Sequence, residues 1–245
     1  IAAGIETNIL ETYSGLVKKG WDVTVHTSKD TLTEKNKLAT EEVIRGIKIK
    51  RYPFRWWSYW PAIEWNNTDL LCLHNFNVMP HAAIMAYAGI LKLFGKKQFA
   101  LILTPHGGFN PEWSIFSPLT RTIKKLYHFT LGVLLINASV DGVRGVSEWE
   151  HNEIVKKGVR KNRVITISNG VEDEAYRDVE NEASIEIKNT VQKLGRYIIQ
   201  IGRVYMIKNY ETTIRALTRL PKDVTFVIVG PVGDNAYKAM LERMI

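Results

Sequence analysis

The chain has 245 residues, 45% of them hydrophobic, which suffices for one large or two modest domains and argues against a mainly disordered protein. Cys72 is the only cysteine, so an intrachain disulfide is excluded, and no uncharged apolar run reaches the roughly 18 residues that a membrane-spanning helix needs. The formal net charge of +8 favours anionic partners: phosphorylated sugars, anionic lipid headgroups or nucleic acid.

The first part of the chain alternates helical and strand patterns. Apolar residues recur at spacings of three and four from Ile5 to Val17, which predicts a helix that ends before Gly20. Strands are predicted at residues 23–27, 47–52, 70–73, 100–104, 142–146 and 164–167, and helices at 80–94, 118–136 and 148–157. This alternation is typical of a parallel sheet covered on both faces, so we expect an α/β fold.

A second unit follows an acidic, weakly apolar stretch at residues 172–186. Strands are predicted at 197–201 and 224–229 and helices at 211–220 and from 236 onward, too few elements to close a doubly wound domain. We therefore predict a Rossmann-like N-terminal domain over residues 1–173, a linker with a leading helix over 174–195, and an incomplete second Rossmann-like domain over 196–245.

The segment with the most chemical information is the strand-to-helix connection of the second unit. Gly202 lets a ligand approach the backbone, Arg203 offers a planar fork of donors, and Lys208 precedes a predicted helix start, where backbone amides also favour anions. Ligands of open parallel sheets bind at the carboxyl ends of strands, where these residues lie. The pattern predicts a diphosphate site, although isolated Arg and Lys residues are usually ordinary surface charges.

The whole string from residue 198 to 217 resembles the corresponding segment of retaining glycosyltransferases of family four, which have the GT-B fold. The resemblance implies that Arg203 and Lys208 hold the donor diphosphate and balance charge on the departing nucleotide. We expect both cations to converge, across the crevice between the two domains, on the turn that bears His106.

Other stretches resemble the same family in the expected order. Gly4 and Glu6 match a glycine loop that opens the first helix under the donor phosphates, although Ala3 replaces the family's first glycine. The turn at His106 and Gly107 matches one whose histidine lies beside the transferred sugar. Gly230 matches the glycine end of a strand that passes near the nucleotide base.

The segment at residues 54–61 is rich in aromatic side chains. Arg55, Trp56 and Trp57 could stack on an acceptor sugar or lie at a lipid interface. The alternative interpretation is an aromatic loop packed into its own domain.

The resemblance implies a hexosyltransferase-type enzyme that moves a sugar, with retention, from a UDP- or GDP-sugar to a glycan, lipid-linked or small-molecule acceptor. No tightly bound cofactor and no metal are expected. The first strand and the two-glutamate segment of family members are missing, so we expect a chain truncated at both ends and inactive as given. A cytoplasmic protein, peripheral to the inner face of an anionic membrane, fits the composition.

Two other classes stay open: a sugar-nucleotide epimerase with the same pair of domains, and a catalytically incomplete binding fragment. Nucleic-acid binding is not expected, because the cations are dispersed and no recognised motif is present.

Overall fold

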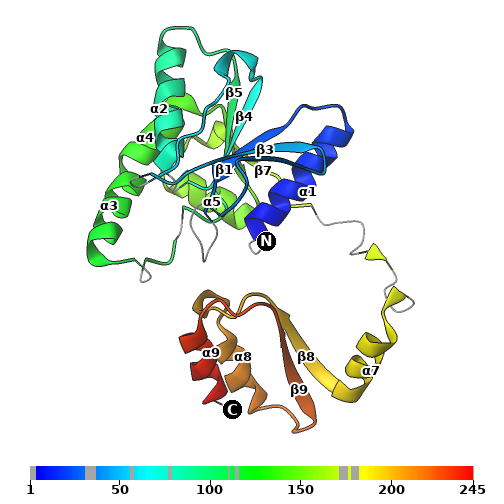
Figure 1. Cartoon of the computed structure of the whole chain (residues 1–245). Helices are drawn as coiled ribbons and strands as arrows, with labels where there is room; N and C mark the ends of the chain where they lie inside the picture. The colour runs from blue at the N-terminus through cyan, green and yellow to red at the C-terminus, as the bar shows by residue number, and fades with distance from the viewer. Residues whose placement is uncertain are drawn as a thin grey trace. The chain divides into compact units, whose positions relative to one another are not determined.

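The computed structural model describes residues 4–30, 37–55, 58–76, 79–109, 111–113, 116–170, 176–177 and 182–244. The chain divides into two compact units, Ile1–Glu172 and Asp173–Ile245 (Figure 1). Each unit has its own sheet structure and its own cluster of buried apolar side chains. The predicted α/β fold class is confirmed.

The described part of unit 1 begins with helix α1, Gly4–Lys18, followed by strands β1, Thr24–Ser28, β2, Glu41–Ile44, and β3, Ile47–Tyr52. These strands form one sheet in the order β1-β3-β2, with β1 parallel and β2 antiparallel to β3. The sequence did not predict β2, which has no continuous apolar run. It forms because Arg45 and Gly46, at φ 50° and 82°, close the tight turn of a hairpin with β3.

The second sheet of unit 1 consists of strands β4, Leu70–His74, β5, Ala100–Thr104, β6, Gly142–Gly145, and β7, Val164–Thr166. All neighbouring pairs are parallel in the order β4-β5-β6-β7. The connections contain α2, Met79–Leu93, α3, Pro118–Phe129, α4, Leu131–Ser139, α5, Glu148–Lys156, and the short 3-10 helices η1, Trp65–Asn67, and η3, Lys161–Arg163. The core gathers buried side chains from this sheet and its helices, among them Met85, Leu101, Leu103, Ile136, Val143 and Ile154.

The helix predicted at residues 118–136 is not continuous. It breaks at Thr130, whose φ of −130° and ψ of −92° are not helical. The Thr130 hydroxyl donates to the Leu126 carbonyl oxygen at 2.6 Å, and Gly132 then packs so closely that a Cβ there would lie 2.6 Å from Cζ of Phe76. The break thus lets α4 pack closely against Phe76 in the core.

Unit 2 contains α7, Ile185–Leu194, β8, Arg196–Ile201, the 3-10 helix η5, Met206–Lys208, α8, Tyr210–Leu217, β9, Val224–Val229, and α9, Asn235–Glu242. Strands β8 and β9 are parallel and in register from Arg196↔Val224 to Ile201↔Val229. Their core contains Val204, Tyr210, Ile214, Tyr237 and Leu241.

We expect Leu103→Ala to lower the free energy of unfolding of unit 1 by about 2 to 5 kcal/mol, because Leu103 is fully buried in β5 and its truncation leaves a cavity. All seven tryptophans lie at or before residue 149, so their fluorescence during urea denaturation reports on unit 1. Ile165→Ala, in the exposed part of β7, is the control, with an expected loss below about 1 kcal/mol. Equal losses in both variants would contradict this core.

Candidate active site

The carboxyl ends of β4 and β5 lie side by side in unit 1. His74 ends β4 and pairs with Thr104, which ends β5. Immediately after them, Asn75 has φ 80° and His106 has φ 51°, both in the left-handed region that non-glycine residues rarely adopt. Such backbone strain is concentrated at functional sites, and this edge is where ligands of parallel sheets bind.

His106 belongs to a chain of three hydrogen-bonded side chains. Its Nε2 lies 2.9 Å from Nδ1 of His74, and Nε2 of His74 lies 2.7 Å from the Tyr13 hydroxyl. The two imidazoles stack with centroids 5.2 Å apart, while the Tyr13 ring meets His74 edge-on. Helix α1 is thereby connected to the turn that bears His106.

Both histidines favour the neutral form. Burial, followed by the charges of His106, His81 and Arg144, lowers the pKa of His74 from 6.5 to about 3. Burial is also the main reason that the pKa of His106 is lowered; Arg144 lowers it too, whereas the Glu150 carboxylate raises it. A hydrogen bond between two neutral imidazoles requires one ring to donate and the other to accept, so the chain couples their tautomers.

Glu150 fixes the backbone around His106. This carboxylate in α5 is only 2% exposed and accepts the backbone N–H of Gly107 with one oxygen. Its other oxygen accepts the N–H of Val146, just after β6, at 2.8 Å. The turn is also sterically closed, because a Cβ at Gly108 would lie 2.8 Å from the Pro105 carbonyl oxygen.

Arg144 supplies positive charge at the same edge of the sheet. Its Nε donates to the Ile167 carbonyl at 2.9 Å, and its Nη2 contacts Ser168 and Asn169 oxygens at 3.0 Å. The guanidinium therefore joins β6 to the segment after β7.

Sequence reasoning placed His106 and Gly107 here but missed Tyr13, His74, Arg144 and Glu150. The Ser147-x-x-Glu150 spacing of a capping box was the available signal for Glu150. No local pattern distinguishes His74 from other strand-end histidines.

The predicted donor residues of α1 lie at its start. Gly4 is its first residue, with open space where a Cβ would be, and Glu6 is exposed in its first turn. Ala3 lies outside the described residues. Asn8, buried on the same helix, has a side-chain oxygen Oδ1 without a hydrogen-bond partner.

In unit 2, the predicted phosphate residues cluster where β8 and β9 end. A Cβ at Gly202 would lie 3.5 Å from Cε of Lys208, so the Lys208 side chain runs along this glycine. The buried Tyr210 donates its hydroxyl to the Gly202 carbonyl at 2.7 Å. Gly202, Arg203 and Lys208 therefore belong to one well-packed turn.

The neighbouring glycines of unit 2 are required sterically. A Cβ at Gly230 would collide with the carbonyl oxygen of Gly202, and one at Gly233 would collide with the methylenes of Arg203. Since Arg203 and Lys208 lie in unit 2 and His106 in unit 1, their convergence stays a prediction.

The third predicted group is the aromatic segment of unit 1. Arg55 and Ser58 exchange backbone hydrogen bonds of 2.7 and 3.1 Å, and Trp56 and Trp57 lie outside the described residues.

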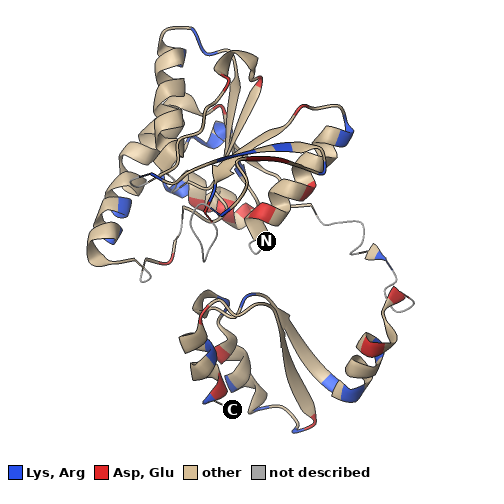
Figure 2. Ribbon diagram, in the orientation of Figure 1, with Lys and Arg blue, Asp and Glu red and all other residues tan. Residues whose placement is uncertain are grey.

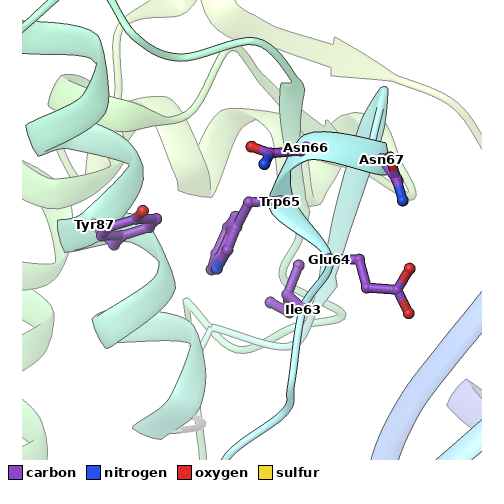
Figure 3. Close-up of a pocket in the computed structure, with 6 residues that line it drawn as sticks. All are labelled: Ile63, Glu64, Trp65, Asn66, Asn67 and Tyr87. Atoms are coloured by element: carbon purple, nitrogen blue, oxygen red, sulfur yellow. The ribbon is translucent and has the colours of Figure 1, made fainter.

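A pocket of about 460 Å³ lies at the other end of β4 from His74, where Trp65 and Tyr87 face one another with ring centroids 4.8 Å apart (Figure 3). Beside it, Glu64 is paired with Lys50 at 3.1 Å.

Among the described residues, no group of three or more His, Cys, Asp or Glu side chains is arranged to hold a metal ion. Likewise, none of the helices in the described part of the chain is long and apolar enough to cross a bilayer.

The sequence profile of Glycosyltransferase Family 4 matches residues 2–175, which include the α1 start and the His106 turn. The chain belongs to this family. The family 4 resemblance noted in the sequence is thereby confirmed.

Solved structures similar to this chain include Anabaena Alr3699/HepE in complex with UDP-glucose, with TM-score 0.56 and 19% identity, over 82% of this chain and 52% of that one. The same protein in complex with UDP and glucose gives TM-score 0.64 and 17% identity over 99% and 62%. The chain thus spans about half to three-fifths of the length of these two structures, and the predicted GT-B fold is confirmed. A comparison with curated proteins gave no match.

We expect acid to destabilise unit 1 partly through His74. Its folded-state pKa of about 3 lies below the ordinary 6.5, so the unfolded chain binds the proton first, and stability falls as the pH drops below 6.5. Between pH 7 and 5 this group contributes a loss of about 2 kcal/mol. In His74→Gln, tryptophan-monitored urea denaturation should show a correspondingly smaller loss.

Tyr13→Phe is the matched control, because it removes the hydroxyl that contacts His74 but leaves the imidazole buried. It should keep the acid dependence of the wild type. Identical pH dependence in wild type and His74→Gln would refute the role of His74.

Proposed function

We propose that this family 4 protein is a retaining hexosyltransferase that moves a sugar from a nucleoside-diphosphate sugar to an acceptor hydroxyl. The observation that carries the proposal is the strained His106 turn, held by Glu150 and His74 at the carboxyl edge of a parallel sheet. A second cluster, with Gly202, Arg203 and Lys208 in one turn of unit 2, suits a diphosphate.

A UDP-sugar is the donor that we favour over a GDP-sugar. Two solved structures of similar fold, at 19% and 21% identity, are Anabaena Alr3699/HepE in complex with UDP-glucose and with UDP. In our proposal Gly4 and Glu6 lie under the donor phosphates, Gly107 lies near the sugar, and Gly230 lies near the base.

The chemistry of the leaving group assigns the roles. Breaking the bond between sugar and phosphate builds oxocarbenium character on the sugar and extra negative charge on the diphosphate, so cations at the phosphates stabilise the transition state. Arg203 and Lys208 supply these cations. The acceptor hydroxyl attacks from the face that the phosphate leaves, and the phosphate oxygen takes its proton, so no carboxylate nucleophile is needed.

His106 acts beside the sugar as a neutral ring. Because burial lowers its pKa, the imidazole carries no charge near neutral pH, and it does not repel the positive charge that develops on the sugar. A neutral ring also has one donor and one acceptor nitrogen for sugar hydroxyls and for His74.

The acceptor that we propose is a glycan or a lipid-linked sugar, reached from the cytoplasmic side of a membrane. The formal net charge of +8 supports contact with an anionic surface, and a chain with one cysteine fits a reducing compartment. Arg55, with Trp56 and Trp57, is the proposed contact to the acceptor.

We expect Arg203→Ala in the intact enzyme to lower donor-dependent turnover about tenfold to more than a hundredfold, because about 1.5 to 3 kcal/mol is lost per charge-assisted contact. Arg196→Ala is the control: Arg196 starts β8, the strand that ends before Gly202, and its partner is Asp223 at 3.2 Å. Its turnover should stay within about twofold of wild type. Unchanged turnover and donor affinity in Arg203→Ala would refute the assignment.

Product analysis separates transfer from epimerisation of the donor. With acceptor present, we expect free nucleoside diphosphate and glycosylated acceptor in equal amounts, measured by chromatography and mass spectrometry. A changed sugar nucleotide without release of nucleoside diphosphate would instead identify an epimerase.

A further inference from the structure

Helix α3 exposes its apolar side, which a helix at a protein surface normally buries. Leu119, Ile123 and Leu126 follow one another at spacings of four and three, and they are 72%, 60% and 66% exposed. The inward side instead carries His128, which is 3% exposed and packs edge-on against Phe76 at 4.7 Å. An amphipathic helix in water shows the opposite arrangement, with its apolar stripe toward the core.

The exposed apolar surface continues past the break at Thr130. We use the term apolar face for six exposed side chains of α3 and the beginning of α4: Leu119, Ile123, Leu126, Phe129, Leu131 and Leu134. Large exposed apolar surfaces mark contacts with other molecules rather than with water.

The charged side chains of α3 are all cationic. No Asp or Glu occurs between Glu112 and Asp141, whereas Arg121, Lys124 and Lys125 lie on α3. Figure 2 shows blue and no red along α3. The ammonium groups of Lys124 and Lys125 lie over the rings of Phe116 and Trp113, at 5.0 and 5.6 Å, and that of Lys157 lies 5.0 Å from the Phe129 ring.

We propose that the apolar face docks α3 and α4 on an anionic lipid bilayer. Helices of 12 and 9 residues are too short to span it and suit a position in the interfacial plane, with apolar side chains among the acyl chains and lysines at the headgroups. The cations of α3, in a stretch of sequence without acidic residues, match anionic lipid, because basic side chains are what headgroup phosphates attract.

The docked face lies close to the candidate site. Phe76, two residues after His74, is fully buried and stacks on Phe109 at 4.4 Å, which itself lies three residues after His106. Phe76 also contacts Tyr127 and His128 from the inner side of α3. Docking therefore brings the His106 turn toward the membrane, and if the proposed transfer holds, it favours a lipid-linked acceptor.

Vesicle cosedimentation of the intact protein, without donor or acceptor, tests the proposal independently of transfer. Phosphatidylcholine vesicles containing phosphatidylglycerol should bind the wild type at least about tenfold more tightly than pure phosphatidylcholine vesicles. Ile123→Glu with Leu126→Glu should lower binding at least about tenfold. The control Val43→Glu, at a 68% exposed apolar position of β2, should bind like the wild type.

Two further variants separate the contribution of the α3 lysines from that of the tryptophan loop. Lys124→Gln with Lys125→Gln should remove most of the preference for phosphatidylglycerol, and Trp56→Ser with Trp57→Ser should leave binding unchanged. Urea denaturation monitored by tryptophan fluorescence should give the same stability for Ile123→Glu with Leu126→Glu as for the wild type, because these side chains are exposed.

Several results would overturn the proposal. Equal binding by the wild type and Ile123→Glu with Leu126→Glu would exclude the apolar face, and loss of binding in the Trp56, Trp57 variant alone would move the contact to that loop. A wild type that dimerises without lipid, and a glutamate variant that stays monomeric, would show that a second copy covers the face. Destabilisation by the glutamates without vesicle binding would show that the intact chain covers it.

Discussion

The geometry of the candidate site depends on one buried carboxylate. Glu150 accepts the backbone N–H groups of Gly107 and Val146, which follow two adjacent strands of the same sheet. A buried carboxylate is costly unless donors satisfy it, so these two turns are held at the spacing that the carboxylate requires. His106 lies between β5 and the Gly107 N–H that Glu150 binds. Its left-handed backbone conformation persists because these neighbours on both sides are fixed.

The second constraint on His106 comes from the neighbouring strand β4 and from helix α1. His74 reaches it from β4, and Tyr13 fixes His74 from α1, so three elements far apart in the sequence orient one imidazole. Burial keeps the pair neutral. The site in unit 1 is therefore assembled by hydrogen bonds among neutral groups around one satisfied carboxylate, with Arg144 as the nearby cation.

Local sequence patterns predicted those strands that are marked by short apolar runs. The apolar runs at residues 47–52, 100–104 and 224–229 coincide with β3, β5 and β9, whereas the His106 turn was identified by its resemblance to the family. Tyr13 and His74 escaped prediction because their roles depend on the register His74↔Thr104 and on helix packing, which no local spacing encodes. The break at Thr130 likewise reflects packing of Gly132 on Phe76. The family resemblance assigns Gly230 to a contact with the nucleotide base. The structure adds a steric reason for glycine at residue 230, because a Cβ there would collide with the Gly202 carbonyl oxygen.

The parallel pair β8–β9 leaves apolar side chains exposed: Ile198, Ile199 and Ile201 on one strand and Val229 on the other are all more than one-third exposed. Parallel strands are ordinarily shielded on both faces. Unit 2 expressed by itself would accordingly be prone to aggregation, with uncovered strands seeking any apolar surface. Nucleotide affinities measured on aggregated protein would not describe the folded site, so ligand titrations on unit 2 need a parallel measurement of particle size.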